Sequence, residues 1–174
     1  MKVTDSRVVY RGSVFSVRRD EISMPDGTTA VREVADHADA VAVVAVDGEG
    51  NVLLERQYRH PAGKVLLEIP AGSIEPGEDP EEAVRREMQE ETGFLPRTVK
   101  RLGGFYSAPG WVTEYLYLYL AADLVPSRLM AEDTEEIKLE IVPPDQVPEL
   151  IRSGEIEDSK TVAGLLLYLS LKNP

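Results

Sequence analysis

Three glutamates stand close together at positions 87, 90 and 91, in a segment whose residue types favour a helix. At about 100° per residue, Glu91 lies about 40° to one side of Glu87 and Glu90 about 60° to the other, so the three carboxylates share an arc of about 100°. The apolar residues of the segment project from that same side of the helix: Ala83, Val84 and Met88. The three carboxylates are therefore expected to face the body of the protein.

Carboxylates in such an arrangement require positive charge nearby. Like charges four residues apart destabilise a helix, and partial burial raises that cost. Arg86 lies at the edge of the arc and can pair with one carboxylate. The remaining positive charge is most simply supplied by a hard divalent cation that prefers carboxylate oxygens, Mg²⁺ or Mn²⁺. The ordinary alternative is a solvated helix face. A calcium loop does not fit, because the acids lie along a helix.

The segment directly before this helix, residues 71–78, contains two glycines and a proline. Such a loop can turn sharply and bring a backbone carbonyl, or the carboxylate of Glu78, over the helix. Glycine-rich segments also serve as plain connections. The position of this one directly before the glutamates favours a functional role.

The elements that must position these residues follow from hydrophobic periodicity and turn signals. A turn at 24–27 divides a strand-rich region at 6–35. Further strands are expected at 40–46, 52–58, 66–69, 115–120 and 137–142, and helices at 80–92, 146–152 and 160–171, the last capped by Asp158 and Ser159. Strands and helices are mixed without regular alternation, which predicts an α+β fold with a mixed sheet flanked by helices.

Composition excludes several classes of protein. The 174 residues carry a net charge of −12 and contain no cysteine. We therefore expect no nucleic-acid partner, no disulfide and no thiolate metal site. No apolar stretch reaches the length of a membrane span, and residues 1–14 do not resemble a signal peptide. A cytoplasmic location is the default expectation.

Residues 72–94 resemble the Nudix box. Gly72, Glu78, the run 86–91 and the run 92–94 occupy the fixed positions of that motif. The resemblance implies a Nudix fold, a mixed sheet between helices, and hydrolysis of a nucleoside diphosphate linked to another moiety. It also implies functions for individual residues. The metal ligands would be Glu87, Glu90, Glu91 and the Ala71 carbonyl, while Arg86 would orient a glutamate and Glu78 would brace the loop.

The rest of the chain resembles one branch of that family, the ADP-ribose pyrophosphatases, from about Tyr10 to Leu171. The features that carry this are Pro109, sixteen residues after Gly93, and the runs 55–59, 68–72 and 158–161. The resemblance implies that a divalent-metal enzyme cleaves ADP-ribose to AMP and ribose 5-phosphate. It also implies a homodimer, with residues 1–37 as a β-rich, dimerising region and 38–174 as the hydrolase domain.

Substrate contacts are expected outside the box as well. The guanidinium of Arg59 can bind a diphosphate through two oxygens, although it could also be a surface arginine on a strand. Members of the branch bind adenine partly through the N-terminal region of the partner, for which Phe15, Arg32 and Glu33 are the candidates. The loop that holds Pro109 and Gly110 is assigned to substrate binding too. Its Trp111 could line the sugar site or simply pack.

Hydrolysis also needs a carboxylate that removes a proton from the attacking water. The branch places an extra glutamate for this on a loop, which corresponds here to residues 130–136. Glu135 is our first choice. Glu132, Asp133 and Glu136 stay open, as does a purely solvated acidic loop.

Two other functions remain possible from the sequence. One is a Nudix hydrolase that acts on another nucleotide sugar or on a dinucleotide. The other is a non-catalytic Nudix-like ligand sensor, which the complete set of box glutamates disfavours.

Overall fold

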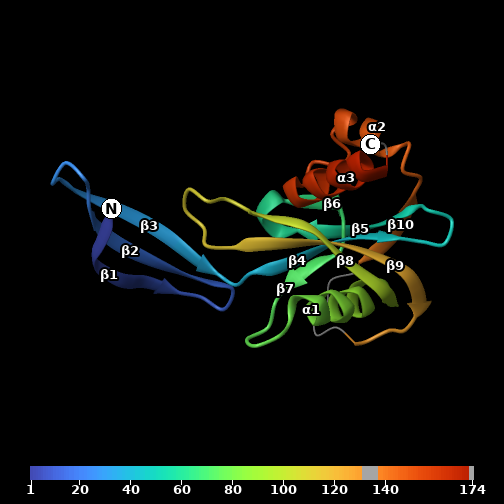
Figure 1. Cartoon of the computed structure of the whole chain (residues 1–174), viewed down its shortest axis with the longest axis horizontal. Coiled ribbons are helices and arrows are strands. Elements are labelled where there is room, and N and C mark those ends of the chain that lie inside the picture. The colour runs from blue at the N-terminus through green and yellow to red at the C-terminus, as the bar shows by residue number, and fades with distance from the viewer. Residues whose placement is uncertain (131–136, 173–174) are drawn as a thin grey trace. The chain divides into compact units, whose positions relative to one another are not determined.

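The computed structural model describes residues 1–130 and 137–172. The chain divides into two compact units, whose elements are labelled in Figure 1. The first unit contains Met1–Asp39 and Tyr106–Tyr115, and the second contains Ala40–Phe105 and Leu116–Pro174.

The first unit is built on an antiparallel sheet of three strands in the order β1 (Lys2–Arg11), β2 (Phe15–Ser23) and β3 (Thr29–His37). The turn between β2 and β3 lies where the sequence predicts it, and Gly27 adopts the positive φ of 85° there. The second segment of this unit, Tyr106–Tyr115, pairs with the sheet at Ala35. The Ala35 N–H donates to the Trp111 carbonyl at 2.7 Å, and the Thr113 N–H donates to the Ala35 carbonyl at 3.0 Å.

The second unit contains a seven-stranded mixed sheet. Its strands are β4 (Ala40–Val46), β5 (Val52–Arg59), β6 (Lys64–Glu68), β7 (Ala71–Ser73), β8 (Phe94–Tyr106), β9 (Tyr115–Pro126) and β10 (Lys138–Val142). The main order is β10-β5-β4-β9-β8, with β6 paired to β5 and β7 to β4. Strands β4 and β9 run parallel, whereas β4 and β5 run antiparallel.

Helices cover both faces of this sheet. Helix α1 (Pro80–Glu87) lies on one face, and α3 (Ser159–Lys172) lies on the other, near the short helix α2 (Val147–Ser153); a 3-10 turn, η1 (His60–Ala62), connects β5 to β6. Buried residues form one cluster under α3 and a second under α1. The predicted α+β class, with a mixed sheet between helices, is confirmed.

The helix that carries the glutamates differs from the expected uniform α-helix. It keeps the predicted limits and ends at Gly93, whose φ is 78°, but the α-helical part stops at Glu87 and a π-helical turn, η2 (Met88–Thr92), follows. In this wider turn the Gly93 N–H donates to the carbonyl of Met88, five residues earlier. The 100° spacing therefore does not hold beyond Glu87, and the π-helical turn sets the directions of Glu90 and Glu91.

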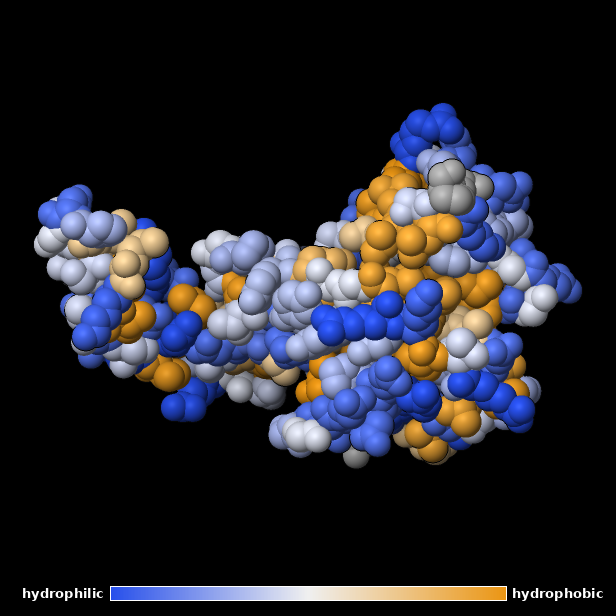
Figure 2. All heavy atoms as spheres, viewed as in Figure 1, coloured by the Kyte–Doolittle hydropathy of each residue, from blue (hydrophilic) through white to orange (hydrophobic). Residues whose placement is uncertain are grey.

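None of the helices in the described ranges 1–130 and 137–172 combines the length and the apolarity that crossing a bilayer requires. On the face drawn in Figure 2, hydrophobic residues gather around α3. Leu166 and Leu171 of that helix are exposed.

Candidate active site

Arg86 ties the loop before α1 to the helix itself. Its Nε and Nη2 donate to the two carboxylate oxygens of Glu78 at 2.8 and 2.9 Å, and Nη2 also donates to the Ser73 carbonyl at 2.9 Å. Its Nη1 donates to Glu87 at 2.6 Å and to Glu90 at 3.2 Å. The hydrogen bonds to Glu78 are the main reason that the pKa of Arg86 is raised, and the same contact lowers the pKa of Glu78. One cation thus holds three acids and a backbone carbonyl in place.

Gly72 provides the space that the carboxylate of Glu87 occupies. A Cβ placed on Gly72 would lie only 2.0 Å from the Cδ and Oε1 atoms of that carboxyl group. The backbone of Gly72 cannot easily move away, because β7 pairs with β4 through Val41 opposite Gly72. Only glycine therefore allows Glu87, which is buried, to lie against this strand.

Glu91 faces the same loop from the π-helical turn. Its Oε2 accepts a hydrogen bond from the Ala71 N–H at 3.1 Å. Burial is the main cause that raises the pKa of Glu91 well above its ordinary value, and the charges of Glu55 and Glu87 add to the effect. Burial also raises the pKa of Glu87. The predicted ligands Ala71, Glu87 and Glu91 are thus brought to one place.

The structure adds an acid that the sequence reasoning did not single out. Glu55 of β5 has no exposed surface, and neither of its carboxylate oxygens has a hydrogen-bond partner among the described residues. Burial raises its pKa to about 7. In the sequence, the feature that could have identified Glu55 is its position directly after the apolar run 52–54 of a predicted strand.

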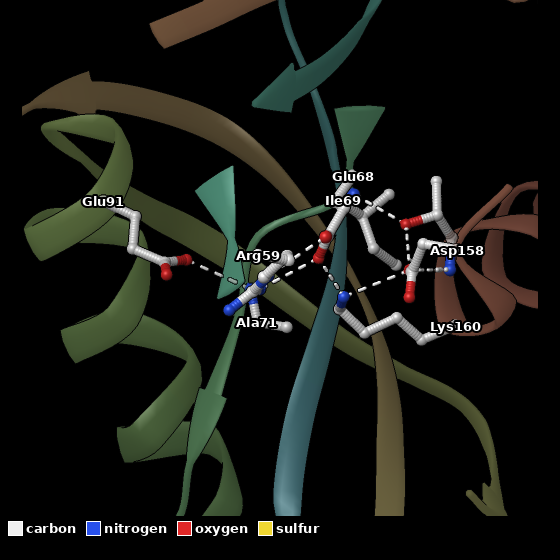
Figure 3. A network of polar contacts seen from close by, with 8 residues as sticks. Arg59, Glu68, Ile69, Ala71, Glu91, Asp158 and Lys160 are labelled. Atoms are coloured by element: carbon white, nitrogen blue, oxygen red, sulfur yellow. Dashed lines mark hydrogen bonds and ion pairs between the residues drawn. The ribbon is translucent and has the colours of Figure 1, made fainter. Parts of the chain in front are cut away.

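Arg59, the predicted diphosphate ligand, lies at the end of β5 in a network of polar contacts (Figure 3). Its Nε and Nη2 donate to the two oxygens of Glu68 at 3.0 and 2.9 Å. Burial alone would lower the pKa of Arg59, but the hydrogen bonds and charge of Glu68 raise it. The position of this guanidinium is therefore fixed by a carboxylate that is itself buried.

The network continues from Glu68 to the start of α3. Lys160 donates to Glu68 and, at 3.1 Å, to Asp158. Asp158 accepts from the N–H and the hydroxyl of Thr161 at 2.9 and 2.6 Å, and so caps the helix as predicted. The Thr161 hydroxyl in turn accepts from the Ile69 N–H at 3.0 Å. These contacts join α3 to the segment that leads to Ala71.

The residues around Ala71 fit a divalent cation by their chemistry. Glu55, Glu87 and Glu91 offer hard oxygen donors, and their burial favours either a proton or a cation on each carboxylate. Within the described residues, no three acidic or histidine side chains converge as a ready-made ligand set. Arg86 instead draws Glu87 and Glu90 to its own guanidinium.

The first unit contains a separate, open pocket of about 370 Å³. Its lining residues are Phe15, Val17, Glu33, Val34, Ala35 and Trp111. The structure therefore brings Phe15 and Glu33 together, as well as Trp111. Arg32, the third candidate, is not among the residues that line this pocket. Pro109 and Gly110 are exposed in the turn before Trp111.

The predicted base Glu135 and its alternatives Glu132, Asp133 and Glu136 lie outside the described residues.

Comparisons with known proteins agree with this architecture. The sequence model of the NUDIX domain matches residues 36–165, and that of the nucleoside diphosphate sugar hydrolase N-terminal domain matches residues 1–35. An ADP-ribose pyrophosphatase of Bacillus subtilis is 33% identical over 94% of this chain and 89% of its own length. A GDP-mannose pyrophosphatase of an Enterobacter species is 35% identical over 80% of this chain and 78% of its own. The crystal structure of an ADP compounds hydrolase superposes with a TM-score of 0.89 at 23% identity, and covers 98% of this chain and 92% of that one.

Proposed function

Because this chain belongs to the Nudix family, as a pyrophosphatase, we propose that it hydrolyses nucleoside diphosphate sugars with the help of Mg²⁺ or Mn²⁺. ADP-ribose is the first candidate substrate, with AMP and ribose 5-phosphate as products. The observation that carries this proposal is the convergence of Glu87 and Glu91 on the backbone at Ala71 and Gly72.

The proposed metal-binding residues are Glu87, Glu90, Glu91 and the carbonyl of Ala71. A divalent cation bound there would neutralise charge on the diphosphate and lower the pKa of a coordinated water. Arg86 supports this site from the side, because it holds Glu87 and Glu90 through one nitrogen. Glu78 keeps Arg86 in position through two hydrogen bonds.

Arg59 is proposed to bind the diphosphate. A guanidinium presents five N–H donors, and Glu68 accepts from only the Nε and Nη2 groups. Its planar fork suits phosphate oxygens. A carboxylate must take the proton of the attacking water, for which Glu91 and Glu135 are the proposed candidates.

The pocket of the first unit is proposed to bind the adenine base. Phe15 and Trp111 offer aromatic surface, and Glu33 offers a hydrogen-bond acceptor for an exocyclic amino group. Pro109 and Gly110 would shape the neighbouring turn, and Arg32 would contact the substrate from outside this pocket. The names of relatives support ADP-ribose as the substrate. GDP-mannose is the second candidate, since a relative carries that name.

The test is a product assay on a panel of substrates. The wild-type protein is incubated with ADP-ribose, GDP-mannose and a dinucleotide, with Mg²⁺, with Mn²⁺ or with chelator, and the products are separated by ion-exchange chromatography. The proposal expects AMP and ribose 5-phosphate in equal amounts, only when metal is present, and the largest kcat/KM for ADP-ribose. A higher kcat/KM for GDP-mannose than for ADP-ribose would make GDP-mannose the preferred substrate. No cleavage of any diphosphate would refute the catalytic function.

A homodimer assembled through residues 1–37, a hydrolase domain at 38–174 and a cytoplasmic location stay predictions. Sedimentation equilibrium would test the first of these.

A further inference from the structure

Glu55 lies on the face of the sheet that carries the active-site glutamates. Leu53, two residues earlier on β5, packs in the cluster under α1, whereas Leu54 packs under α3. Because side chains two residues apart on a strand share a face, Glu55 projects toward the α1 side. Its side chain has no exposed surface there. An acid there needs a specific reason.

The cationic side chains near Glu55 form their ion pairs with a different acid. Strands β5 and β6 place Glu55 directly opposite Glu68, so two carboxylates stand side by side, an unfavourable cross-strand pair. Arg59 and Lys160 both bind Glu68. Glu55 keeps two buried oxygens without a hydrogen-bond partner among the described residues. Lys160 and Arg59 therefore bond to Glu68, whereas they act on Glu55 through their charge alone, which offsets part of the rise in its pKa that burial causes.

The remaining charged neighbours of Glu55 belong to the active site. Glu87 acts on it electrostatically from α1. Burial is the main cause that raises the pKa of Glu91, and the negative charges of Glu55 and Glu87 raise it further. The three acids come from a strand and from two successive helical turns, so elements distant in the sequence bring their charges within range of one another.

We propose that Glu55 is an additional carboxylate ligand that acts with Glu91 to bind a divalent cation on this face of the sheet. The inference rests on the proposed function, because it adds a residue to the same metal site. Mg²⁺ is commonly bound by one or two carboxylates, with waters and substrate phosphates as the other ligands. Glu55 and Glu91 can therefore hold the cation together, and the other acids of the site need not all bind it directly.

The experiment measures Mn²⁺ binding directly, without nucleotide. The wild type and the variants Glu55→Gln, Glu55→Leu and Glu91→Gln are titrated with Mn²⁺. Free Mn²⁺ is followed by electron paramagnetic resonance, and heat by calorimetry. Glu82→Gln is the matched control, because it removes the same charge from an exposed position on α1. Circular dichroism checks the fold of each variant, and the thermal midpoint is recorded with and without Mn²⁺.

The proposal expects Glu55→Gln to weaken Mn²⁺ binding by at least about tenfold. Replacing a residue that only supports a metal ligand already weakens binding by about tenfold or more, so a ligand itself should lose at least as much. Glu82→Gln should bind like the wild type. Glu55→Leu should raise the midpoint of the metal-free protein, because it removes a buried unpartnered carboxylate, and should reduce the further rise that Mn²⁺ causes. This second variant keeps the test decisive if Glu55→Gln does not fold.

Wild-type Mn²⁺ affinity and stoichiometry in the Glu55 variants would overturn the inference. If the wild type still hydrolysed ADP-ribose with Mg²⁺ in that case, the proposed function would stand. Conversely, loss of Mn²⁺ binding in Glu55→Gln, combined with a wild type that cleaves no nucleoside diphosphate, would support the metal ligand and refute the proposed function.

Discussion

Replacing Gly72 by alanine should lower catalytic activity strongly while the protein stays folded. The φ of Gly72 lies in the range that other residues adopt, so the backbone tolerates alanine. The new methyl group, however, would lie only 2.0 Å from the Cδ and Oε1 atoms of Glu87, far closer than two such atoms can approach. Glu87 is buried under the loop, and Arg86 holds one of its oxygens at 2.6 Å. The carboxylate must therefore leave its present position.

The magnitude follows from this overlap. Overpacking of a buried site costs about 1–3 kcal/mol, and for a chain of this length about 1 kcal/mol lowers the thermal midpoint by about 2–4 °C. A displacement of about 1 Å at a positioned catalytic group can reduce the rate about a hundredfold. We therefore expect Gly72→Ala to lower kcat about a hundredfold while its midpoint falls by no more than about 12 °C.

The assay compares kcat for ADP-ribose at saturating Mg²⁺ with the midpoint from circular dichroism. Gly48→Ala is the control, because a Cβ at Gly48 meets no atom within 4 Å. It should leave both values close to those of the wild type. A folded Gly72→Ala protein with wild-type kcat would refute the claim that the carboxylate of Glu87 works from its observed position.

Further predictions concern the network and the buried acids. Lys160→Met should destabilise the protein by about 1–3 kcal/mol in urea unfolding, because it removes a partner of the buried Glu68. The control Lys64→Met breaks an exposed ion pair and should cost at most about 1 kcal/mol. Equal costs would contradict the stabilising contact between Lys160 and Glu68. Burial raises the pKa of Glu55 from 4.5 to about 7, so the folded state binds more protons than the unfolded state in that interval. The stability of the metal-free protein should therefore fall as pH rises from about 4.5 to about 7, by up to about 3 kcal/mol from this group, and Glu55→Gln should flatten the profile; an unchanged profile would contradict the prediction. Arg59→Lys should lower kcat/KM for ADP-ribose by at least about tenfold, since an ammonium lacks the planar fork, and steady-state rates at wild-type level would exclude Arg59 from diphosphate binding.

The central part of the fold could be predicted because its sequence signals are local. The apolar run 40–46 is strand β4, and the turn signal at 47–51 separates it from β5 as expected. Asp158 caps α3 at the predicted place. These elements depend on hydrophobic runs and on side chains that bond to their own backbone, and both can be identified in one sequence.

Elements that depend on pairing partners were missed or only partly predicted. Strand β8 (Phe94–Tyr106) contains a proline, two adjacent glycines and several charged residues, so no alternation marks it. Strand β1 begins at Lys2, earlier than the alternating pattern indicates, and all its residues are exposed. Pairing with neighbouring strands defines both, and a single sequence does not contain that information.

Within the candidate site, the acids of the helix could be predicted but not their exact directions. The π-helical turn after Glu87 changes the spacing on which the angular argument depends. The interaction of Gly72 with Glu87 depends on a three-dimensional contact across β7. Glu55 was overlooked because an acid that ends an apolar run resembles the polar residue of a half-buried strand, whereas both faces of β5 are buried there.

The assignment of the metal site depends most on whether ADP-ribose cleavage requires both Mg²⁺ and Glu91. AMP release by the wild type and by Glu91→Gln is measured with Mg²⁺, after removal of metal by chelation, and after Mg²⁺ is restored. We predict that the wild type loses activity with chelator and regains it with Mg²⁺, while a folded Glu91→Gln protein stays inactive throughout. Cleavage that persists without metal, or full activity in Glu91→Gln, would contradict the assignment of this site.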